Sequence, residues 1–385
     1  MLIDTVFAVL IYVAAWALLY VLSRMLDWEK KGIIVAPFFL MLKTSYLNQR
    51  LGFISAKRER IWRMIWNLGI VLAFGQMFFI IYFLTQNLVD LAYRTPQAAS
   101  MVLLLPGITV SLETLPYVIL ALAVVLLTHE FAHAIASLTD AVPIKSAGLF
   151  LAFIVPGGFV ELDEEQVERA SLLTKLRVFS AGSSTNIAAW LVVSLLIVNF
   201  TMSISPLYQG PSGILVSGVI DNGGASEAGM KKWDVIYAVN DQPVRNADEL
   251  GKMMSEIQPG KALSLKTERG NISVLTKPHP QDPKRALLGI YPFNYYAPNL
   301  SFLPKDLPYH LYWSEYWTSS LLVWVAIFNT LPLYPLDGDK IIYSLVSARS
   351  KAAAKLVRIS ASGIFLIIVG LNLLISFLNF GLTRL

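Results

Sequence analysis

Long apolar runs constrain this chain more than any other feature of its sequence. A run of about 20 apolar residues is long enough to cross the hydrocarbon core of a bilayer as a helix. The chain contains six such runs, at residues 2–23, 64–85, 116–138, 177–200, 316–332 and 359–380. Charged residues make up only 15% of the chain, whereas soluble domains typically have about 25%. We therefore predict a polytopic α-helical membrane protein with about six transmembrane helices.

A shorter apolar run, IIVAPFFLML at residues 33–42, cannot span the bilayer as a helix. We expect it to lie in the membrane interface or to re-enter the membrane. The N-terminal run lacks a basic n-region and a small-residue cleavage site. We therefore interpret it as a retained span rather than a signal peptide.

The distribution of basic residues predicts the orientation of the chain. Segment 24–63 carries nine Lys and Arg residues, whereas loop 86–115 carries only Arg94. Segments 139–177 and 338–358 carry four and five, and they fall on the same side as 24–63. Because cytoplasmic loops are enriched in Lys and Arg, we expect both termini outside. The same rule explains the net charge of +5, so nucleic acid is not expected as a partner.

The chain contains no cysteine. This excludes disulfides, thiolate nucleophiles and cysteine-bound metals. Together with the modest length, the lack of cysteine favours a prokaryotic plasma membrane over an organelle.

Residues 205–300 have the composition of a soluble domain, which we expect outside the membrane. Four strand patterns (ILVSGVI, DVIYAVN, LSLKT and ISVLT) and an amphipathic helix near 246–257 predict an α+β fold. SGILVSGVIDNGGASEAGMKKWDVIYAVNDQPV resembles the PDZ domains of bacterial and membrane proteases. The resemblance is carried by Ala225, Ala228, Gly229, Trp233, Asp234, Ile236 and Asn240. Trp233 stands where a glycine is usual.

The PDZ-like domain has two possible uses. If it binds a peptide end, we expect Ser212, Gly213, Ile214 and Leu215 to form the carboxylate-binding loop. The alternative, which we favour, is a steric filter that keeps bulky substrates away. The rest of the chain divides into an N-terminal membrane region at 1–115 and two halves of a membrane core at 116–204 and 301–385.

LLTHEFAHAIAS, at residues 126–137, places three ionisable side chains inside an apolar run. On a helix, His129 and His133 lie on one face and can bind one ion, and Glu130 can reach a water on that ion. This spacing is typical of zinc sites in which the glutamate is the general base. Each ionisable group near the middle of a span costs about 2.5–3.5 kcal/mol, so a bound cation is expected. The alternative is a pair of buried histidines hydrogen-bonded to neighbouring helices.

A catalytic zinc ion takes three protein ligands and keeps one position open. The remaining histidines, His279 and His310, belong to the outer insert, so we expect a carboxylate as the third ligand. Asp337 is the main candidate, because it follows the fifth run at the cytoplasmic end. Glu161 is the second candidate. The alternative for Asp337 is a surface residue after an ordinary Pro-Gly helix stop.

HEFAH and NTLPLYPLDG together resemble the paired signatures of the site-2 protease family of intramembrane zinc metalloproteases. The resemblance covers about residues 115–345. It implies that His129, His133 and Asp337 bind one Zn²⁺ ion and that Glu130 is the general base. It also implies a membrane-anchored protein substrate that is cut within its transmembrane helix.

GLFLAFIVPGGFVELDEE and LTKLRVFSAGSSTNIAAW resemble the region between the two family signatures, a hairpin and a helix bearing an asparagine. We expect Asn186 and Asn329 to donate to the substrate backbone or the oxyanion; the alternative is hydrogen bonding between helices. We expect the hairpin at Pro156, Gly157 and Gly158 to pair with an extended substrate by strand addition. A polar passage from the cytoplasm is also expected, since the site lies roughly 13 Å from the span end.

Two other function classes remain open. A zinc transporter would also need intramembrane histidines and carboxylates, although its polar groups would be spread through the bilayer rather than clustered at one end. A non-catalytic membrane scaffold would bind clients through the PDZ-like domain, but it would have no use for Glu130. We therefore predict a metalloendopeptidase that performs regulated intramembrane proteolysis.

Overall fold

The computed structural model describes residues 2–382, with the backbone only for residues 2–9, 11, 44–48 and 164. The chain forms two compact units. The membrane unit comprises Met1–Val193 and Trp317–Leu385, and the insert unit comprises Ser194–Tyr316.

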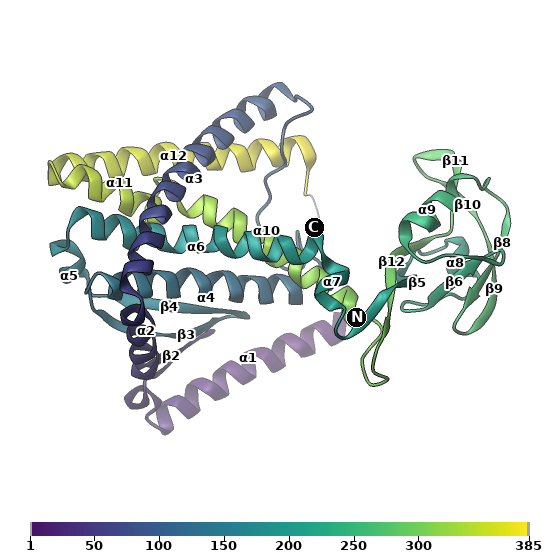
Figure 1. Ribbon diagram of the computed structural model, residues 1–385, viewed down its shortest axis with the longest axis horizontal. Helices are drawn as coiled ribbons and strands as arrows, with labels where there is room; N and C mark the ends of the chain where they lie inside the picture. The colour runs from purple at the N-terminus through teal and green to yellow at the C-terminus, as the bar shows by residue number, and fades with distance from the viewer. Residues whose placement is uncertain (1, 383–385) are drawn as a thin grey trace. The chain divides into compact units, whose positions relative to one another are not determined.

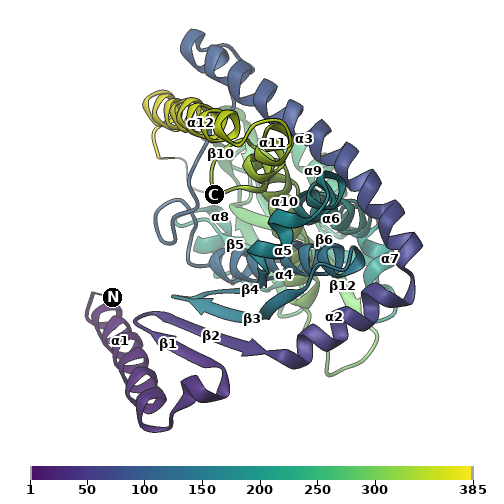
Figure 2. The ribbon, with the colours of Figure 1, turned by 90° about the vertical axis from the view of Figure 1, so that its left-hand side faces the viewer.

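Long helices dominate the membrane unit. They are α1 (Leu2–Met25), α3 (Glu59–Tyr93), α4 (Leu115–Thr139), α6 (Leu172–Val198), α10 (Leu307–Asn329) and α12 (Lys351–Phe380). In Figures 1 and 2, α3 crosses α4, α6 and α12 at an angle.

Four of the described helices, α3, α4, α6 and α12, are long and apolar enough to cross a membrane. The expected count of six spans is therefore not confirmed, but four of the six expected runs coincide with these helices. α10 forms near the expected fifth run, but polar and aromatic residues fill its N-terminal half and lower its hydropathy. The first expected run falls partly on side chains outside the described residues, and the remainder of α1 is the apolar helix Tyr12–Met25.

A four-stranded antiparallel sheet lies against α4 (Figure 2). Its strands are β1 (Ile33–Ala36), β2 (Phe39–Thr44), β3 (Ile144–Ala152) and β4 (Val155–Leu162), in that order across the sheet. The run 33–42, expected in the membrane interface or as a re-entrant segment, forms the β1–β2 hairpin, and its place relative to the membrane stays a prediction. A Cβ on Gly148 would lie 1.9 Å from the Leu42 carbonyl oxygen, so the absence of a side chain there lets β2 pair with β3.

β3 and β4 form the expected hairpin, but the turn lies at Phe153 and Ile154. Pro156, Gly157 and Gly158 are inside β4 rather than in the turn. An added Cβ on Gly157 would lie 2.5 Å from the Phe150 ring, and one on Gly158 would lie 2.9 Å from the Leu127 side chain. Gly157 therefore leaves room for a β3 side chain, and Gly158 allows β4 to pack closely against α4.

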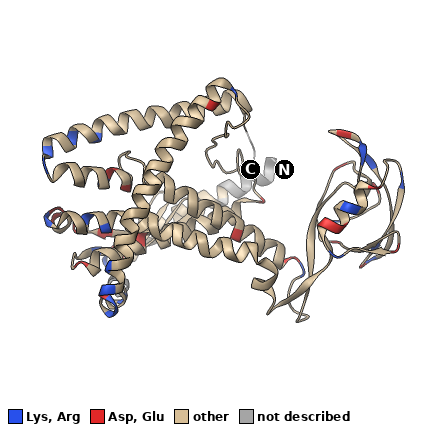
Figure 3. Ribbon diagram, turned by 45° about the horizontal axis from the view of Figure 1, so that its top comes forward, with Lys and Arg blue, Asp and Glu red and all other residues tan. Residues whose placement is uncertain are grey.

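Charged residues gather at one end of the membrane unit, which carries α2 (Ser45–Lys57) and α5 (Glu164–Arg169), and the helix middles are nearly free of charge (Figure 3). At this end Asp140, directly after α4, links α3 to α6. Its carboxylate accepts hydrogen bonds from Arg177 Nη1 at 3.0 and 3.1 Å and from Arg63 Nε at 3.1 Å.

The insert unit is built around an antiparallel sheet with the strand order β12-β5-β6-β8-β9. Its strands are β5 (Tyr208–Val219), β6 (Val235–Val239), β8 (Ala262–Thr267), β9 (Gly270–Leu275) and β12 (Ile290–Pro298), and β7 (Gln242–Pro243) pairs with β6. α9 (Ala247–Ser255) begins after Asn246, whose side chain accepts the Glu249 N–H at 2.9 Å. The four strand patterns and the amphipathic helix are confirmed.

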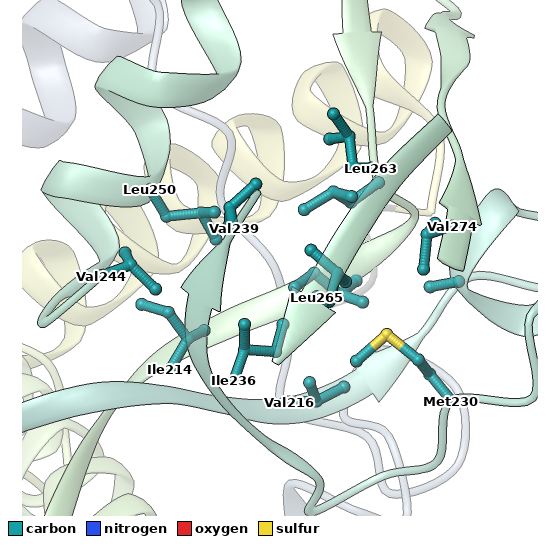
Figure 4. Close-up of a cluster of buried hydrophobic side chains, with 13 residues drawn as sticks. Ile214, Val216, Met230, Ile236, Val239, Val244, Leu250, Leu263, Leu265 and Val274 are labelled. Atoms are coloured by element: carbon teal, nitrogen blue, oxygen red, sulfur yellow. The ribbon is translucent and has the colours of Figure 1, made fainter. Parts of the chain in front are cut away.

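Aliphatic side chains from the strands and α9 fill the core of the insert unit (Figure 4). Trp233, which replaces the usual glycine, has φ = 73°, a conformation that costs about 1–2 kcal/mol for a residue with a side chain. Its ring packs against Tyr309, with the centroids 5.2 Å apart, and the Lys232 ammonium lies 5.0 Å from its centre. These contacts offset the backbone strain.

The remaining elements are η1 (Trp28–Lys31), α7 (Phe200–Ile204), α8 (Gly224–Glu227), β10 (Lys277–His279), β11 (Asp282–Leu287) and α11 (Asp337–Ser347).

Candidate metal centre

His129 and His133 lie one turn apart on α4, as the spacing predicts. Their side chains are buried, with 4% and 7% of the residue surface exposed. The ring centroids are 4.7 Å apart, and the two Nε2 atoms are 3.0 Å apart. Both rings therefore turn the same nitrogen toward one point.

The connection between α10 and α11 brings Asp337 to that point. α10 ends at Asn329, before Pro332, and α11 begins at Asp337 itself. A Cβ on Gly338 would lie 1.9 Å from the Thr330 carbonyl oxygen, so only glycine lets the start of α11 pack against the end of α10. The carboxylate at the first position of α11 is also favoured by the helix dipole.

Asp337 Oδ2 faces both imidazoles, 2.9 Å from His129 Nε2 and 3.0 Å from His133 Nε2. The three residues are buried, and one potential ligand atom from each lies within 4.8 Å of the others. Zinc bonds of about 2.0–2.1 Å at tetrahedral angles separate ligand atoms by about 3.3 Å. The observed spacing fits such an ion within a few tenths of an ångström.

A backbone contact sets the tautomer of His133. Its Nδ1 lies 2.7 Å from the Val178 carbonyl oxygen, which can only accept a hydrogen bond, so Nδ1 carries the proton. A neutral His133 therefore turns the Nε2 lone pair toward Asp337 Oδ2, which is also a lone-pair donor. Two such atoms at 3.0 Å need a proton or a metal ion between them. A backbone carbonyl that fixes the ring in this way is the usual support of a metal-binding histidine.

The two asparagines have different places. Asn329 Nδ2 lies 3.2 Å from His129 Nε2, the nitrogen that faces Asp337. Asn329 also lines a small cavity beside the two histidines. Asn186 is fully buried behind the ring, with Nδ2 3.4 Å from His129 Nδ1, and its Oδ1 accepts the Thr128 hydroxyl at 2.8 Å. Asn186 does not line this cavity, and its contacts with Thr128 and His129 of α4 fit the alternative, hydrogen bonding between helices.

Gly182 on α6 is a site residue that the sequence reasoning missed. A Cβ at this position would lie 2.5 Å from His129 Nε2 and 2.6 Å from His133 Nε2. The imidazoles can occupy their positions only because α6 presents no side chain here. Gly182 lies in the AGSSTN stretch, four residues before Asn186, and this stretch was the available sequence signal.

A cavity of about 210 Å³ opens beside the three buried residues. Glu130 lines it together with Asn329, on the side of the imidazole nitrogens. A carboxylate, an amide donor and a cluster of potential metal ligands thus share one small space, which is the arrangement needed to activate a water against a carbonyl group.

A larger cavity of about 750 Å³, here called the vestibule, adjoins this one. Four residues line both: Val160, Leu162, Phe179 and Lys340. At the vestibule, Glu168 pairs with Lys351 at 2.7 Å. The Lys351 ammonium holds the pKa of Glu168 below its ordinary value.

Glu161, the second candidate ligand, does not join the cluster. Its carboxylate accepts the Ser146 hydroxyl at 2.7 Å and lies 3.4 Å from Lys43 Nζ. These two partners lower the pKa of Glu161, Ser146 most strongly. Glu161 is on the solvent-accessible face of the sheet and ties β4 to β3 and β2.

Segment 212–215 does not offer a free nest of N–H groups. It lies in β5, which pairs with β12 on one side and β6 on the other. The Gly213 N–H donates to the Arg245 carbonyl oxygen at 3.1 Å. The assignment of Ser212, Gly213, Ile214 and Leu215 as a carboxylate-binding loop is therefore wrong for Gly213 and lacks structural support for the rest. β12, in contrast, is an edge strand of this sheet.

Comparison with known proteins agrees with the motifs. The sequence profile of peptidase family M50 matches residues 117–371, more than half of the chain. An uncharacterized protein of Methanocaldococcus jannaschii is 26% identical over 347 residues, which cover 87% of this chain and 84% of that protein.

Two further similarities are more local. A homolog of the membrane-bound transcription factor site-2 protease from Arabidopsis thaliana is 25% identical over 111 residues, 29% of this chain and 22% of that protein. Among solved structures, the PDZ domain of an SdrC-like protein from Listeria innocua matches 21% of this chain and 92% of its own, with 15% identity and a TM-score of 0.19.

Proposed function

The chain belongs to peptidase family M50, and from this premise we propose that it is an intramembrane zinc metalloendopeptidase. Its substrates would be membrane-anchored proteins, cut within a transmembrane helix. One observation carries the proposal: His129, His133 and Asp337 turn ligand atoms toward one buried point, and Glu130 lines the cavity beside it.

Glu130 and Asn329 would carry the proton transfer and the charge stabilisation. When bound, zinc lowers the pKa of a water to about 7 and polarises the scissile carbonyl. Glu130 would accept the proton of the attacking water and deliver it to the leaving amine. The Asn329 amide would donate to the carbonyl oxygen as negative charge develops there. Asn186, held by Thr128, would keep the His129 ring in place.

β4 would bind the substrate as an added strand. The far edge of β3 is taken by β2, and within residues 2–382 no strand pairs with the outer edge of β4. Val160 and Leu162 of β4 line the metal cavity, so an extended peptide on this edge would run past the catalytic groups. Strand addition also exposes the carbonyls that a substrate helix hides in its own hydrogen bonds.

Proline substitutions test this binding mode. Successive backbone N–H groups of a strand point to opposite edges, so one of Phe159→Pro and Val160→Pro removes a donor from the open edge. That variant should keep zinc and lose cleavage, and Val160→Ala controls for the lost side chain. Wild-type cleavage by both proline variants would exclude strand addition to β4.

We propose that the vestibule is the route of water from the cytoplasm, because it shares four lining residues with the metal cavity. This integral membrane protein would then have both termini outside, in a prokaryotic plasma membrane. The basic end of the membrane unit would face the cytoplasm (Figure 3).

The PDZ-like insert would act as a size filter outside the membrane. Deletion of residues 207–300 should allow cleavage of substrates with bulky outer domains that the full chain rejects. If the deletion variant discriminates against these substrates as strongly as the full chain does, the filter is excluded.

The central test compares the wild type with Glu130→Gln in detergent, on a substrate with a single span. Glutamine keeps the size of the side chain but cannot accept a proton. The wild type should cut the substrate, and the variant should hold the same amount of zinc without cutting. Equal cleavage by both would refute the proposal. Zinc flux into vesicles without any cleavage would favour a transporter instead.

A further inference from the structure

The two carboxylate oxygens of Asp337 have different neighbours. Oδ2 faces the His129 and His133 imidazoles, whereas Oδ1 accepts a hydrogen bond from Lys340 Nζ at 3.0 Å. The Asp337 side chain is only 5% exposed, whereas the Lys340 side chain is 43% exposed, so a lysine at the edge of the cavity makes a charge-assisted hydrogen bond to a buried carboxylate oxygen.

We propose that Lys340 is a positioning residue that holds Asp337 in the orientation required by the metal. This inference rests on the proposed function, since it takes His129, His133 and Asp337 to be metal ligands. The lysine and the aspartate are three residues apart on α11 and therefore lie on one face of the helix. With Oδ1 fixed by the ammonium, the carboxylate presents Oδ2 alone to the metal.

Single-oxygen binding matters for the open coordination position. A carboxylate that is free to rotate can bind an ion with both oxygens, and the second oxygen then takes the position that a catalytic site keeps for water. Without Lys340, Oδ1 would be a buried anionic oxygen without its cationic partner. The carboxylate would then rotate so that Oδ1 also binds the metal. Lys340 prevents this rotation.

The surroundings of Lys340 suit this role better than that of a surface charge. Its ammonium lies 5.7 Å from the centre of the Phe179 ring, and the residue lines both the metal cavity and the vestibule. The aromatic contact limits the freedom of the lysine side chain. Although the Lys340 side chain is 43% exposed, its ammonium lies beside both Asp337 Oδ1 and the Phe179 ring.

Metal affinity in the purified full-length protein tests the proposal. Zn²⁺ binding is measured by competition with a chromophoric chelator, and the ligand geometry is followed by the visible absorption of the Co²⁺-substituted protein. Lys340→Met should weaken Zn²⁺ binding by about 10–100-fold, the usual effect of removing a residue that orients a ligand. It should also change the Co²⁺ spectrum.

Two further variants separate positioning from a general effect of charge. Lys340→Arg keeps a donor for Oδ1 and should restore most of the affinity and the wild-type spectrum. Lys355 is an exposed residue of α12 and lines neither cavity. The Lys355→Met variant should therefore bind metal as the wild type does. If Lys340→Met is not monodisperse in detergent, Lys340→Gln takes its place.

The outcomes distinguish this inference from the proposed function. If Lys340→Met and Lys340→Gln bind Zn²⁺ as tightly as the wild type and give its Co²⁺ spectrum, while His129→Ala binds none, the metal site stands and the role of Lys340 is refuted. If wild type and His129→Ala bind Zn²⁺ equally, the metal site and the proposed function both fail, and this inference fails with them.

Discussion

Substitution of Gly182 by alanine tests the packing of the metal centre. The new Cβ would lie 2.5 Å from His129 Cε1 and Nε2 and 2.6 Å from His133 Nε2. Non-bonded carbon contacts are comfortable at about 3.5–4.0 Å, so the imidazoles must retreat by about 1 Å. A misplacement of this size costs on the order of 100-fold in rate.

The same substitution should not unfold the protein. Overpacking a well-packed site costs about 1–3 kcal/mol, and replacing glycine within a helix returns up to about 1 kcal/mol. The expected net destabilisation is therefore about 0–2.5 kcal/mol. Gly182→Ala should fold, hold zinc weakly and cleave poorly.

Zinc content after chelator competition and cleavage of a single-span substrate are measured on the same preparation. Gly363→Ala is the matched control, because this exposed helical glycine on α12 has no atom within 4 Å of an added Cβ. It should match the wild type in both assays. Wild-type zinc affinity and cleavage in Gly182→Ala would refute the described packing of α6 against the two histidines.

Contacts of Asn329, Asp140 and Glu168 can be tested by single substitutions. Asn329→Ala should lower kcat by about 10²–10³-fold with zinc content unchanged; loss of zinc would contradict its role toward the substrate. Asp140→Asn should lower the unfolding free energy by about 2 kcal/mol, as measured by denaturant titration. Breaking a fully buried ion pair costs about 3–5 kcal/mol, and the cost is smaller here because the Arg177 side chain keeps some exposure. Glu168 has a lowered pKa, so its pair with Lys351 stabilises the fold above pH 4.5 and is lost as pH falls through that lowered pKa; Lys351→Met should abolish this pH dependence of the thermal midpoint.

Local patterns gave the parts of the site that lie on one element. The spacing of His129 and His133 follows from helix periodicity alone. Asp337 required a different argument, in which the scarcity of histidine called for a carboxylate and two prolines marked the end of a helix. The structure brings these three residues together.

The parts that the sequence could not give depend on contacts between distant segments. β2 pairs with β3 across about a hundred residues, and nothing in the run 33–42 specifies that partner. Likewise, Asn186 faces the far side of His129 because of how α6 packs on α4. Lys340 lies one helical turn after Asp337, and its proposed role rests on its hydrogen bond to Oδ1, which the sequence alone does not reveal.

The position of the cut tests the central claim most directly. The intact masses of both products from a purified single-span substrate identify the hydrolysed bond. We expect one bond inside the apolar segment, cut by the wild type and left intact by Glu130→Gln. A cut outside the span, or the same products from both proteins, would contradict it.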